Sequence, residues 1–348
     1  MRHRYLRACS VGLWLAAVVV VSADDTDDFI RAEMKQKNIP GLSLVVLKHG
    51  EVIKSQGYGL ANRAVKTPAA PDTVYKIASV SKQFMATGIM VLVQQGRVRV
   101  DAPVRTYLSD APEAWNDLTV RHLLTHTAGL VREPPGFDPF KTTSDSELLR
   151  TAYPVPLRFK PGDKWEYSNT GYNALAEIIR IVSGKPWPEF IHDAVFKPAG
   201  MTATWPTNTT AVVPNRAQGY VDNDRLLDEP KWLALRPSGG FLSTVLDLAK
   251  WDAALYTDKV LTAASRRQMW TAVTLNDGTA YPYGFGWMLG ERSGHRYVQH
   301  SGGMPGTRAN LSRFVDLDLT IIMLMNLDDV DIEPIVAGVA RRYLPESR

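Results

Sequence analysis

The chain has 348 residues, of which 45% are hydrophobic and 22% are charged. This composition is ordinary for a soluble globular protein, and the length suffices to bury a substantial core. The 40 basic residues outnumber the 36 acidic ones, but three arginines lie within the first seven residues. Without those three, 37 basic residues face 36 acidic ones, so the basic excess gives no support for a nucleic-acid or anionic-membrane partner.

The first 23 residues are typical of a secretory signal peptide. Residues 1–7 are basic, residues 8–21 form an apolar run, and Val21-Ser22-Ala23 has the small residues that signal peptidases accept. We expect cleavage after Ala23. An uncleaved membrane anchor is the alternative, although the run is shorter than the ~20 residues of a spanning helix. Both interpretations place residues 24–348 outside the cytoplasm, as a secreted or periplasmic protein.

Cysteine and metal chemistry have little support in the sequence. The single cysteine, Cys9, lies inside the leader, so the rest of the chain can form neither a disulfide nor a cysteine nucleophile. The histidines show no HExxH or other metal-ligand spacing. We therefore predict no metal and no other cofactor.

Strands are predicted at both ends of the chain that follows the leader. β-Forming residues on either side of His49-Gly50 predict a hairpin of residues 42–48 and 51–57. Apolar runs with β-branched and aromatic residues predict four more strands, at residues 283–289, 296–300, 309–314 and 319–325. Short helices are predicted to flank these strands, at residues 24–37 and 335–343.

The middle of the chain has a different pattern. Helical periodicity and glycine stops predict helices at residues 79–95, 119–126 and 173–182. We predict an α+β fold in which the N- and C-terminal strands form one antiparallel sheet flanked by helices. A mostly helical, loop-rich part at about residues 60–280 is inserted between them, within one domain of residues 24–348.

Ser79-Val80-Ser81-Lys82 opens the first of these central helices. Residues three apart on a helix face the same way, with Cβ atoms roughly 5–6 Å apart, so the Lys82 amine can reach the Ser79 hydroxyl. A serine becomes a nucleophile when an adjacent base takes its proton. A lysine serves as that base when burial or nearby cations lower its pKa. The alternative is a plain helix start with a solvated lysine, because this spacing also arises by chance.

Two further short motifs carry groups that can assist a serine nucleophile. Tyr167-Ser168-Asn169 precedes the third central helix, and there a phenol can shuttle a proton while a carboxamide can hold a lysine and a substrate amide. His300-Ser301-Gly302-Gly303 lies at the end of a predicted strand, and its glycines permit close backbone approach and N–H donation to an oxyanion. Taken singly, the motifs also fit a buried tyrosine with Asn169 as a helix cap, and a turn with a surface histidine.

In their order and spacing, the three motifs resemble those of the serine β-lactamase and penicillin-binding protein family, especially its class C β-lactamase, D-aminopeptidase and esterase-like branch. That family carries S-x-x-K at a helix start, Y-x-N on a mid-chain loop and K/H-x-G on a strand near the C-terminus. Three further stretches are similar to it, at residues 123–130, 237–244 and 283–287. The resemblance covers essentially all of residues 24–345.

The resemblance implies catalytic roles for three residues. Ser79 would be acylated, with Lys82 accepting its proton. Tyr167 would act with Lys82 in passing protons to the leaving group and in activating water for deacylation.

The resemblance also implies substrate-binding roles. Asn169 would position Lys82 and the substrate's amide. His300 would face the substrate's carboxylate or the tyrosine, on a strand that continues through Gly302 and Gly303. The backbone N–H groups of Ser79 and Gly303 would form the oxyanion hole.

His300 is a departure from the penicillin-processing members, which carry lysine in the third motif. A histidine is mostly neutral near pH 7. Histidine variants of this motif resemble the esterase, D-aminopeptidase and mitochondrial-protease-like branches, and this resemblance favours ester or peptide hydrolysis over β-lactamase activity. We therefore predict an exported serine hydrolase that forms an acyl-enzyme on Ser79 and cleaves small esters, D-amino-acid peptides or amides. A β-lactamase and a non-catalytic penicillin-binding-like receptor are the alternatives. The expected partner is a small-molecule or peptide substrate.

Two polar residues beside these motifs are predicted to have no catalytic role. His126 lies at a helix end, where a polar side chain usually finds a backbone partner. Glu166 adjoins Tyr167 and would point the opposite way in an extended segment.

Overall fold

The computed structural model describes residues 24–138, 143–208, 211–221, 225–226 and 236–345. The predicted signal peptide lies outside these ranges, so its cleavage stays a prediction. Within these ranges, every helix is too short or too polar to cross a membrane.

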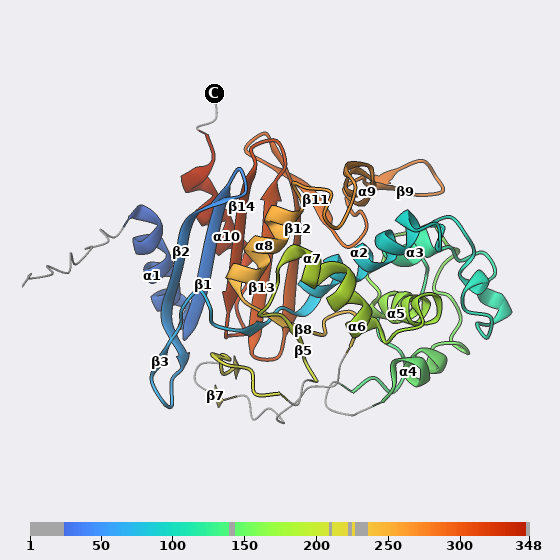
Figure 1. Cartoon of the computed structure of the whole chain (residues 1–348), viewed down its shortest axis with the longest axis horizontal. Helices are drawn as coiled ribbons and strands as arrows, with labels where there is room; N and C mark the ends of the chain where they lie inside the picture. Colours follow the sequence, from blue (N-terminus) through green and yellow to red (C-terminus); the bar gives the residue numbers. More distant parts are fainter. Residues whose placement is uncertain (1–23, 139–142, 209–210, 222–224, 227–235, 346–348) are drawn as a thin grey trace, which may run out of the picture.

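Seven antiparallel strands form the main sheet, in the order β11-β12-β13-β14-β1-β2-β3 (Figure 1). The strands are β1 (Gly41–Lys48), β2 (Glu51–Asn62), β3 (Thr67–Pro68), β11 (Met288–Arg292), β12 (His295–Met304), β13 (Thr307–Phe314) and β14 (Leu319–Met325). The two ends of the chain meet where β1 pairs with β14, with Val45 opposite Ile322. This arrangement confirms the predicted α+β fold with one sheet built from both ends of the sequence.

Helices cover both faces of this sheet and also make up the second half of the molecule. They are α1 (Asp25–Lys37), α2 (Ser81–Gln94), α3 (Val120–Leu124), α4 (Asp145–Thr151), α5 (Asn169–Ser183), α6 (Trp187–Ile191), α7 (Lys197–Ala199), α8 (Val245–Ala254), α9 (Ala263–Met269) and α10 (Glu333–Tyr343). In Figure 1 the sheet stands on the left, and α3 to α6 lie on the right.

Short elements complete the fold between these two halves. They are the strands β4 (Tyr75–Lys76), β5 (Trp205–Pro206), β6 (Tyr220–Val221), β7 (Arg225–Leu226), β8 (Phe241–Ser243), β9 (Val273–Thr274) and β10 (Ala280–Tyr281), and the turns η1 (Ala78–Val80), η2 (Val104–Thr106), η3 (Glu113–Trp115) and η4 (His192–Phe196). Strands β4, β8 and β5 pair in that order.

Strand β1 is apolar except for Ser43 and its last residue, Lys48, and both of its faces are buried. Leu42 and Leu44 pack in the core formed with α1 and α10. Val45 and Leu47 point to the other face and join the larger core of the helical half. Successive strand residues point to opposite faces, so a continuous apolar run is what a doubly covered strand requires.

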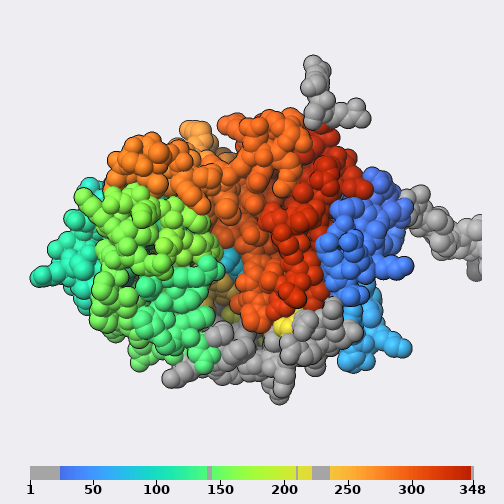
Figure 2. All heavy atoms as spheres, turned by 180° about the vertical axis from the view of Figure 1, so that it is seen from behind, coloured from blue at the N-terminus to red at the C-terminus, as the bar shows by residue number. Residues whose placement is uncertain are grey.

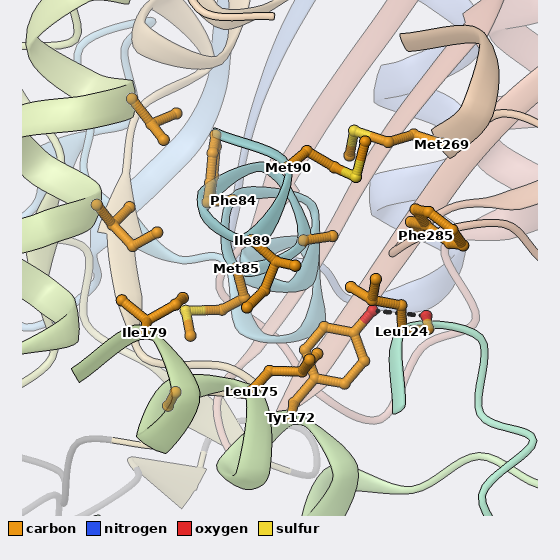
Figure 3. Packing of buried hydrophobic residues seen from close by; sticks show 14 of the residues in the cluster. Phe84, Met85, Ile89, Met90, Leu124, Tyr172, Leu175, Ile179, Met269 and Phe285 are labelled. Atoms are coloured by element: carbon orange, nitrogen blue, oxygen red, sulfur yellow. Dashed lines mark hydrogen bonds between the residues drawn. The ribbon is translucent and has the colours of Figure 1, made fainter. Parts of the chain in front are cut away.

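Helix α2 is the centre of the helical half. Phe84 packs edge-to-face on Phe196 and Trp251, with ring centroids 5.0 and 5.3 Å apart. Figure 3 shows α2 surrounded by buried side chains, among them Ile179 of α5. Gly88 permits the close approach of α6, because a Cβ there would lie 2.4 Å from the Ile191 side chain. This dense packing fixes the start of α2, which carries Lys82 and directly follows the turn that carries Ser79.

Several element boundaries differ from the prediction, and three of these differences lie near Ser79, Lys82 or Asn169. Ser79 lies in the short turn η1, and the α-helix begins only at Ser81, since Ala78 has a left-handed φ of 45°. Helix α5 begins at Asn169 and not at residue 173, and its cap is Ser168, whose hydroxyl accepts the Gly171 N–H.

The third difference concerns the predicted strand at residues 283–289. The structure has β11 at Met288–Arg292, and residues 283–287 form a turn in which Gly286 has a φ of 75°. A Cβ at Gly286 would lie 2.7 Å from the Lys82 carbonyl oxygen. The apolar residues of this stretch therefore pack against α2 as a turn instead of pairing as a strand.

Candidate active site

Ser79 and Lys82 face each other across one helical turn. The Lys82 Nζ lies 3.2 Å from the Ser79 Oγ, within hydrogen-bonding distance. A second bond from Nζ to the Ser238 carbonyl oxygen, at 2.8 Å, fixes the amine from the opposite side of the cleft. The predicted proximity of serine and lysine is thus present in the structure.

Lys82 is fully buried, with 0% of its surface exposed. Its Nζ lies 4.7 Å from the centre of the Tyr167 ring and 5.3 Å from that of Tyr172. Burial holds the pKa of Lys82 well below its ordinary value; the negative charge of Glu133 opposes this shift, and Arg132 adds to it. A lysine in this state is a neutral amine that can take a proton from Ser79.

Tyr167 approaches the same serine oxygen from the mid-chain loop. Its hydroxyl donates to the Ser79 Oγ at 2.9 Å. Burial raises the pKa of Tyr167, although the hydrogen bond to Ser79 opposes the shift, so the phenol carries its proton at neutral pH. The Ser79 oxygen therefore lies between an amine that can accept a proton and a phenol that can donate one.

Asn169 stands at the first position of α5 and lines the cleft beside Ser79. Its Nδ2 donates to the Glu133 carboxylate. Among the described residues it makes no hydrogen bond with Lys82, and its buried Oδ1 has no partner. Asn169 therefore offers a free acceptor in the cleft, while the expected contact with Lys82 is not made in this structure.

His300 lies within strand β12, which continues beyond the predicted end at residue 300 to Met304, and it is only 3% exposed. Its Nε2 is 3.1 Å from the Tyr283 hydroxyl, and its Nδ1 is 2.6 Å from the Ser301 carbonyl oxygen. Burial lowers the pKa of His300 to about 3. The ring is thus neutral and turned toward Tyr283, and His300 is not among the residues that line the cleft.

Gly302 and Gly303 bring β12 against the serine. A Cβ at Gly302 would lie 2.2 Å from the Ile77 carbonyl oxygen and 3.1 Å from the Ser79 nitrogen, so only glycine fits there. Gly303 is exposed and lines the cleft together with Ser79. This placement suits the predicted oxyanion hole, whose function stays a prediction.

The cleft beside Ser79 has a volume of about 230 Å³ and a charged wall. Figure 2 shows a hollow where the green helical half meets the orange and red strands. Three charged residues without a predicted role line this cleft: Arg132, Glu133 and Arg236. They lie next to the stretches 123–130 and 237–244, which resemble the family, and this proximity in the sequence is the signal that could have identified them.

The two polar residues predicted to be non-catalytic also have defined partners. Glu166 forms an ion pair with Arg158 at 2.9 Å and does not line the cleft. The His126 Nδ1 accepts the backbone N–H of Ser168 at 3.1 Å. Within the part of the chain that the structure describes, no group of three or more acidic, histidine or cysteine side chains could hold a metal ion.

Residues 26–338 match the Beta-lactamase family. Together with a buried serine–lysine–tyrosine site, this match defines the protein as a serine hydrolase of that class. The chain belongs to the Beta-lactamase family, as the order of its motifs predicted.

Known relatives agree with this assignment. Penicillin-binding protein 4* of Bacillus subtilis (strain 168) is 31% identical over 325 residues, covering 87% of this chain and 72% of the relative. The penicillin-binding protein homologue of Pyrococcus abyssi, described as octameric, is 26% identical with a TM-score of 0.79, covering 91% of this chain and 76% of that one. The D-amino acid amidase of Ochrobactrum anthropi SV3, solved with L-phenylalanine amide, is 25% identical with a TM-score of 0.78, covering 92% and 97%.

Proposed function

We propose that this protein is an exported hydrolase that forms an acyl-enzyme on Ser79 and cleaves amides, peptides or esters of amino acids with a free amino group. The observation that carries the proposal is the position of the Ser79 Oγ, 3.2 Å from the Lys82 amine and 2.9 Å from the Tyr167 hydroxyl. Burial lowers the pKa of Lys82 and raises that of Tyr167, which favours the neutral amine and the protonated phenol that acyl transfer requires.

The acylation step follows from this arrangement. The Ser79 oxygen attacks the carbonyl carbon while its proton passes to the neutral Lys82 amine. The tetrahedral intermediate collapses when the bond to the leaving group breaks, and Tyr167 gives that group its proton while taking one from Lys82. Water then attacks the acyl-enzyme and gives a proton to the same pair. The pair passes that proton to the Ser79 oxygen as the bond between this oxygen and the acyl carbon breaks, which releases the acid and restores the Ser79 hydroxyl.

The charged wall of the cleft supports a substrate with an amino group. Glu133 is half-buried, is held by Asn169 and lines the cleft beside Ser79, so its carboxylate can pair with an ammonium. The free Oδ1 of Asn169 can accept an N–H from the same substrate. The likeness to the D-amino acid amidase supports amides of D-amino acids as the first substrates to test.

The primary test compares wild type with Ser79→Ala. Both forms of the exported chain are assayed with chromogenic amides and esters of D- and L-amino acids, and with a chromogenic cephalosporin. We expect turnover of the amino-acid substrates by wild type and none by the alanine variant. If wild type turns over none of these compounds and intact mass shows no acyl adduct, the proposal is wrong and a binding role replaces it.

β-Lactam chemistry is the second candidate, supported by the 31% identity to a penicillin-binding protein. Intact mass after incubation with a penicillin distinguishes it. A stable adduct on Ser79 indicates a penicillin-binding enzyme that deacylates slowly, whereas rapid turnover of the cephalosporin indicates a β-lactamase.

Glu133→Gln tests the substrate class within the leading proposal. The substitution keeps an acceptor oxygen near Asn169 but removes the charge that would pair with an ammonium. We expect kcat/KM for an amino-acid amide to fall about tenfold, and kcat/KM for the matching amide without the amino group to stay within about twofold. An equal loss for both substrates would contradict ammonium recognition by Glu133.

Export is proposed from the leader alone. N-terminal sequencing of protein from the secreted or periplasmic fraction is expected to begin at Asp24. A chain that stays in the membrane fraction with residues 1–23 attached indicates the uncleaved anchor instead.

A further inference from the structure

His126 holds Tyr167 from three directions, although it does not touch the serine. Its carbonyl oxygen accepts the Glu166 N–H at 2.9 Å, and its Nδ1 accepts the Ser168 N–H at 3.1 Å. Its ring also packs on the Tyr167 ring, with centroids 4.3 Å apart and planes inclined by 37°. The residues before and after Tyr167, and the face of its ring, are all fixed by one histidine.

The backbone of His126 has an unusual conformation for this purpose. It has a φ of 59°, in the left-handed region that residues other than glycine seldom adopt. Such conformations persist where the surrounding contacts enforce them, and they gather at functional sites. Here the left-handed turn directs both the carbonyl group and the ring of His126 toward the segment that carries Tyr167.

His126, Tyr283 and His300 form a buried row of hydrogen-bonded side chains. One backbone group at each end of this hydrogen-bonded chain determines which atoms carry the protons. The Ser168 N–H can only donate, so the His126 Nδ1 is unprotonated and a neutral ring carries its proton on Nε2. That Nε2 lies 3.1 Å from the Tyr283 hydroxyl oxygen.

The other end of the chain is fixed in the same way. The Ser301 carbonyl oxygen can only accept, so the His300 Nδ1 carries a proton. The His300 Nε2 is then the acceptor for the Tyr283 O–H at 3.1 Å. Tyr283 accepts from His126 and donates to His300, and all three side chains are neutral and buried.

We propose that His126 is a positioning residue for Tyr167. The hydrogen-bonded chain through Tyr283 to His300 holds His126 in the neutral Nε2–H tautomer, whose Nδ1 can accept the Ser168 N–H. His300, the third-motif histidine, therefore serves as the terminal acceptor of this chain and not as an anchor for a substrate carboxylate. The functional part of the proposal rests on the proposed acyl transfer at Ser79.

The chain affects the reaction through the direction of one hydroxyl. Tyr167 donates to the Ser79 Oγ at 2.9 Å, and a displacement of a catalytic group by about 1 Å can cost about 100-fold in rate. Loss of the chain should therefore lower kcat while leaving KM nearly unchanged, because no member of the chain lines the cleft.

A matched pair of substitutions at His126 tests the positioning role. His126→Leu removes the acceptor for the Ser168 N–H, and we expect kcat to fall about 100-fold with KM within about threefold. His126→Asn retains an oxygen near the position of Nδ1, and asparagine tolerates a positive φ. We expect it to recover about tenfold of the lost kcat.

Tyr283→Phe tests the chain with the ring volume unchanged. We expect kcat to fall about tenfold. The control is Tyr75→Phe, which also removes a buried phenol hydroxyl, bonded to Ser43 at 3.0 Å, without touching the chain. It is expected to leave kcat unchanged, and equal losses in the two variants would overturn the proposal.

A spectroscopic measurement tests the chain independently of activity. In protein selectively labelled with ¹⁵N-histidine, nitrogen shifts at pH 7 should report a neutral Nε2–H tautomer for His126 and a neutral Nδ1–H tautomer for His300, with assignments from the His126→Asn and His300→Asn variants. An imidazolium or the opposite tautomer at either residue overturns the chain. If the tautomers are as expected but Ser79 is never acylated, the proposed function fails while the chain stands.

Discussion

Two buried basic side chains in this protein have opposite surroundings. Arg313 of β13 lies 2.5 Å from the Asp252 carboxylate of α8 and packs 3.9 Å from the centre of the Tyr256 ring. Asp252 also accepts from the Thr320 hydroxyl at 2.8 Å. Lys82 is just as buried, but among the described residues its hydrogen-bond partners are a hydroxyl and a carbonyl group.

The difference shows that the desolvation of a buried basic group can lead either to a stabilising ion pair or to a neutral base. Removing a charge from water is expensive unless an opposite charge compensates it. Arg313 has that compensation and ties α8 to the sheet as an ion. Lys82 lacks a bonded carboxylate, so desolvation lowers its pKa and favours the neutral amine, which can act as a base beside Ser79.

The largest expected effect on activity follows from replacing Lys82, the buried basic residue without a bonded carboxylate. Lys82→Met keeps much of the side-chain volume but removes the base, and kcat/KM should fall at least about 10³-fold. The free energy of unfolding should stay the same or rise by about 1 kcal/mol, because a buried amine without a counterion is lost. Steady-state kinetics and urea unfolding measure the two quantities.

Lys82→Arg is the matched control for charge. Arginine keeps its proton at any pH compatible with folding, so it should be as inactive as Lys82→Met and less stable. If the arginine variant retains substantial activity, proton transfer by a neutral residue 82 is contradicted.

Replacing Asp252, the partner of Arg313, should lower stability and leave activity unchanged, which is the opposite of what we expect for Lys82→Met. Asp252→Ala leaves Arg313 buried and unpaired, and we expect the free energy of unfolding to fall by about 3–5 kcal/mol. The kcat/KM of the folded enzyme should stay within about twofold, since the pair lies outside the cleft. The double variant Asp252→Leu/Arg313→Met should recover most of the stability, and a loss equal to that of Asp252→Ala would contradict this account.

Acid should weaken the fold through the buried histidines. Burial lowers the pKa of His126 and of His300, the latter to about 3. Below about pH 6.5 the unfolded chain binds protons that the folded chain excludes, so stability is complete above that pH and falls as pH drops. The slope is up to about 1.4 kcal/mol per pH unit for each histidine.

Urea unfolding at pH 7.5, 6.5, 5.5 and 4.5 measures this slope. His300→Asn removes one of the two groups, and its curve should be shallower than that of wild type below pH 6.5 and parallel to it above. Curves that stay parallel throughout would show that His300 is protonated alike in the folded and unfolded chains.

The smallest effect is expected for an exposed ion pair. Arg121 bonds both oxygens of Asp101, at 2.7 and 3.2 Å, but the two side chains are 35% and 68% exposed. Asp101→Ala should lower the free energy of unfolding by less than about 1 kcal/mol, and 0.5 M salt should reduce even that difference. A loss as large as that of Asp252→Ala would mean that burial is not what separates the two pairs.

The sequence alone determined the sheet of both chain ends and the three motifs with their residue types. The apolar, β-branched runs of β1 and β14 are a local property of the sequence, and the three-residue spacing of Ser79 and Lys82 sets their distance once a helical turn forms. The boundaries near Ser79 and Asn169 were less well predicted, because a left-handed Ala78 and a Ser168 cap depend on what surrounds them.

Only the tertiary structure decided the charge state of Lys82 and the surroundings of Ser79. The sequence contains a lysine; the neutral base exists because Tyr167, Tyr172 and Ser238 enclose it. His126 and Tyr283 are 157 residues apart, and no local pattern predicts that they meet. Desolvation and hydrogen bonding act between neighbours in space, so a sequence can name the reactive groups while only the folded chain sets their protons.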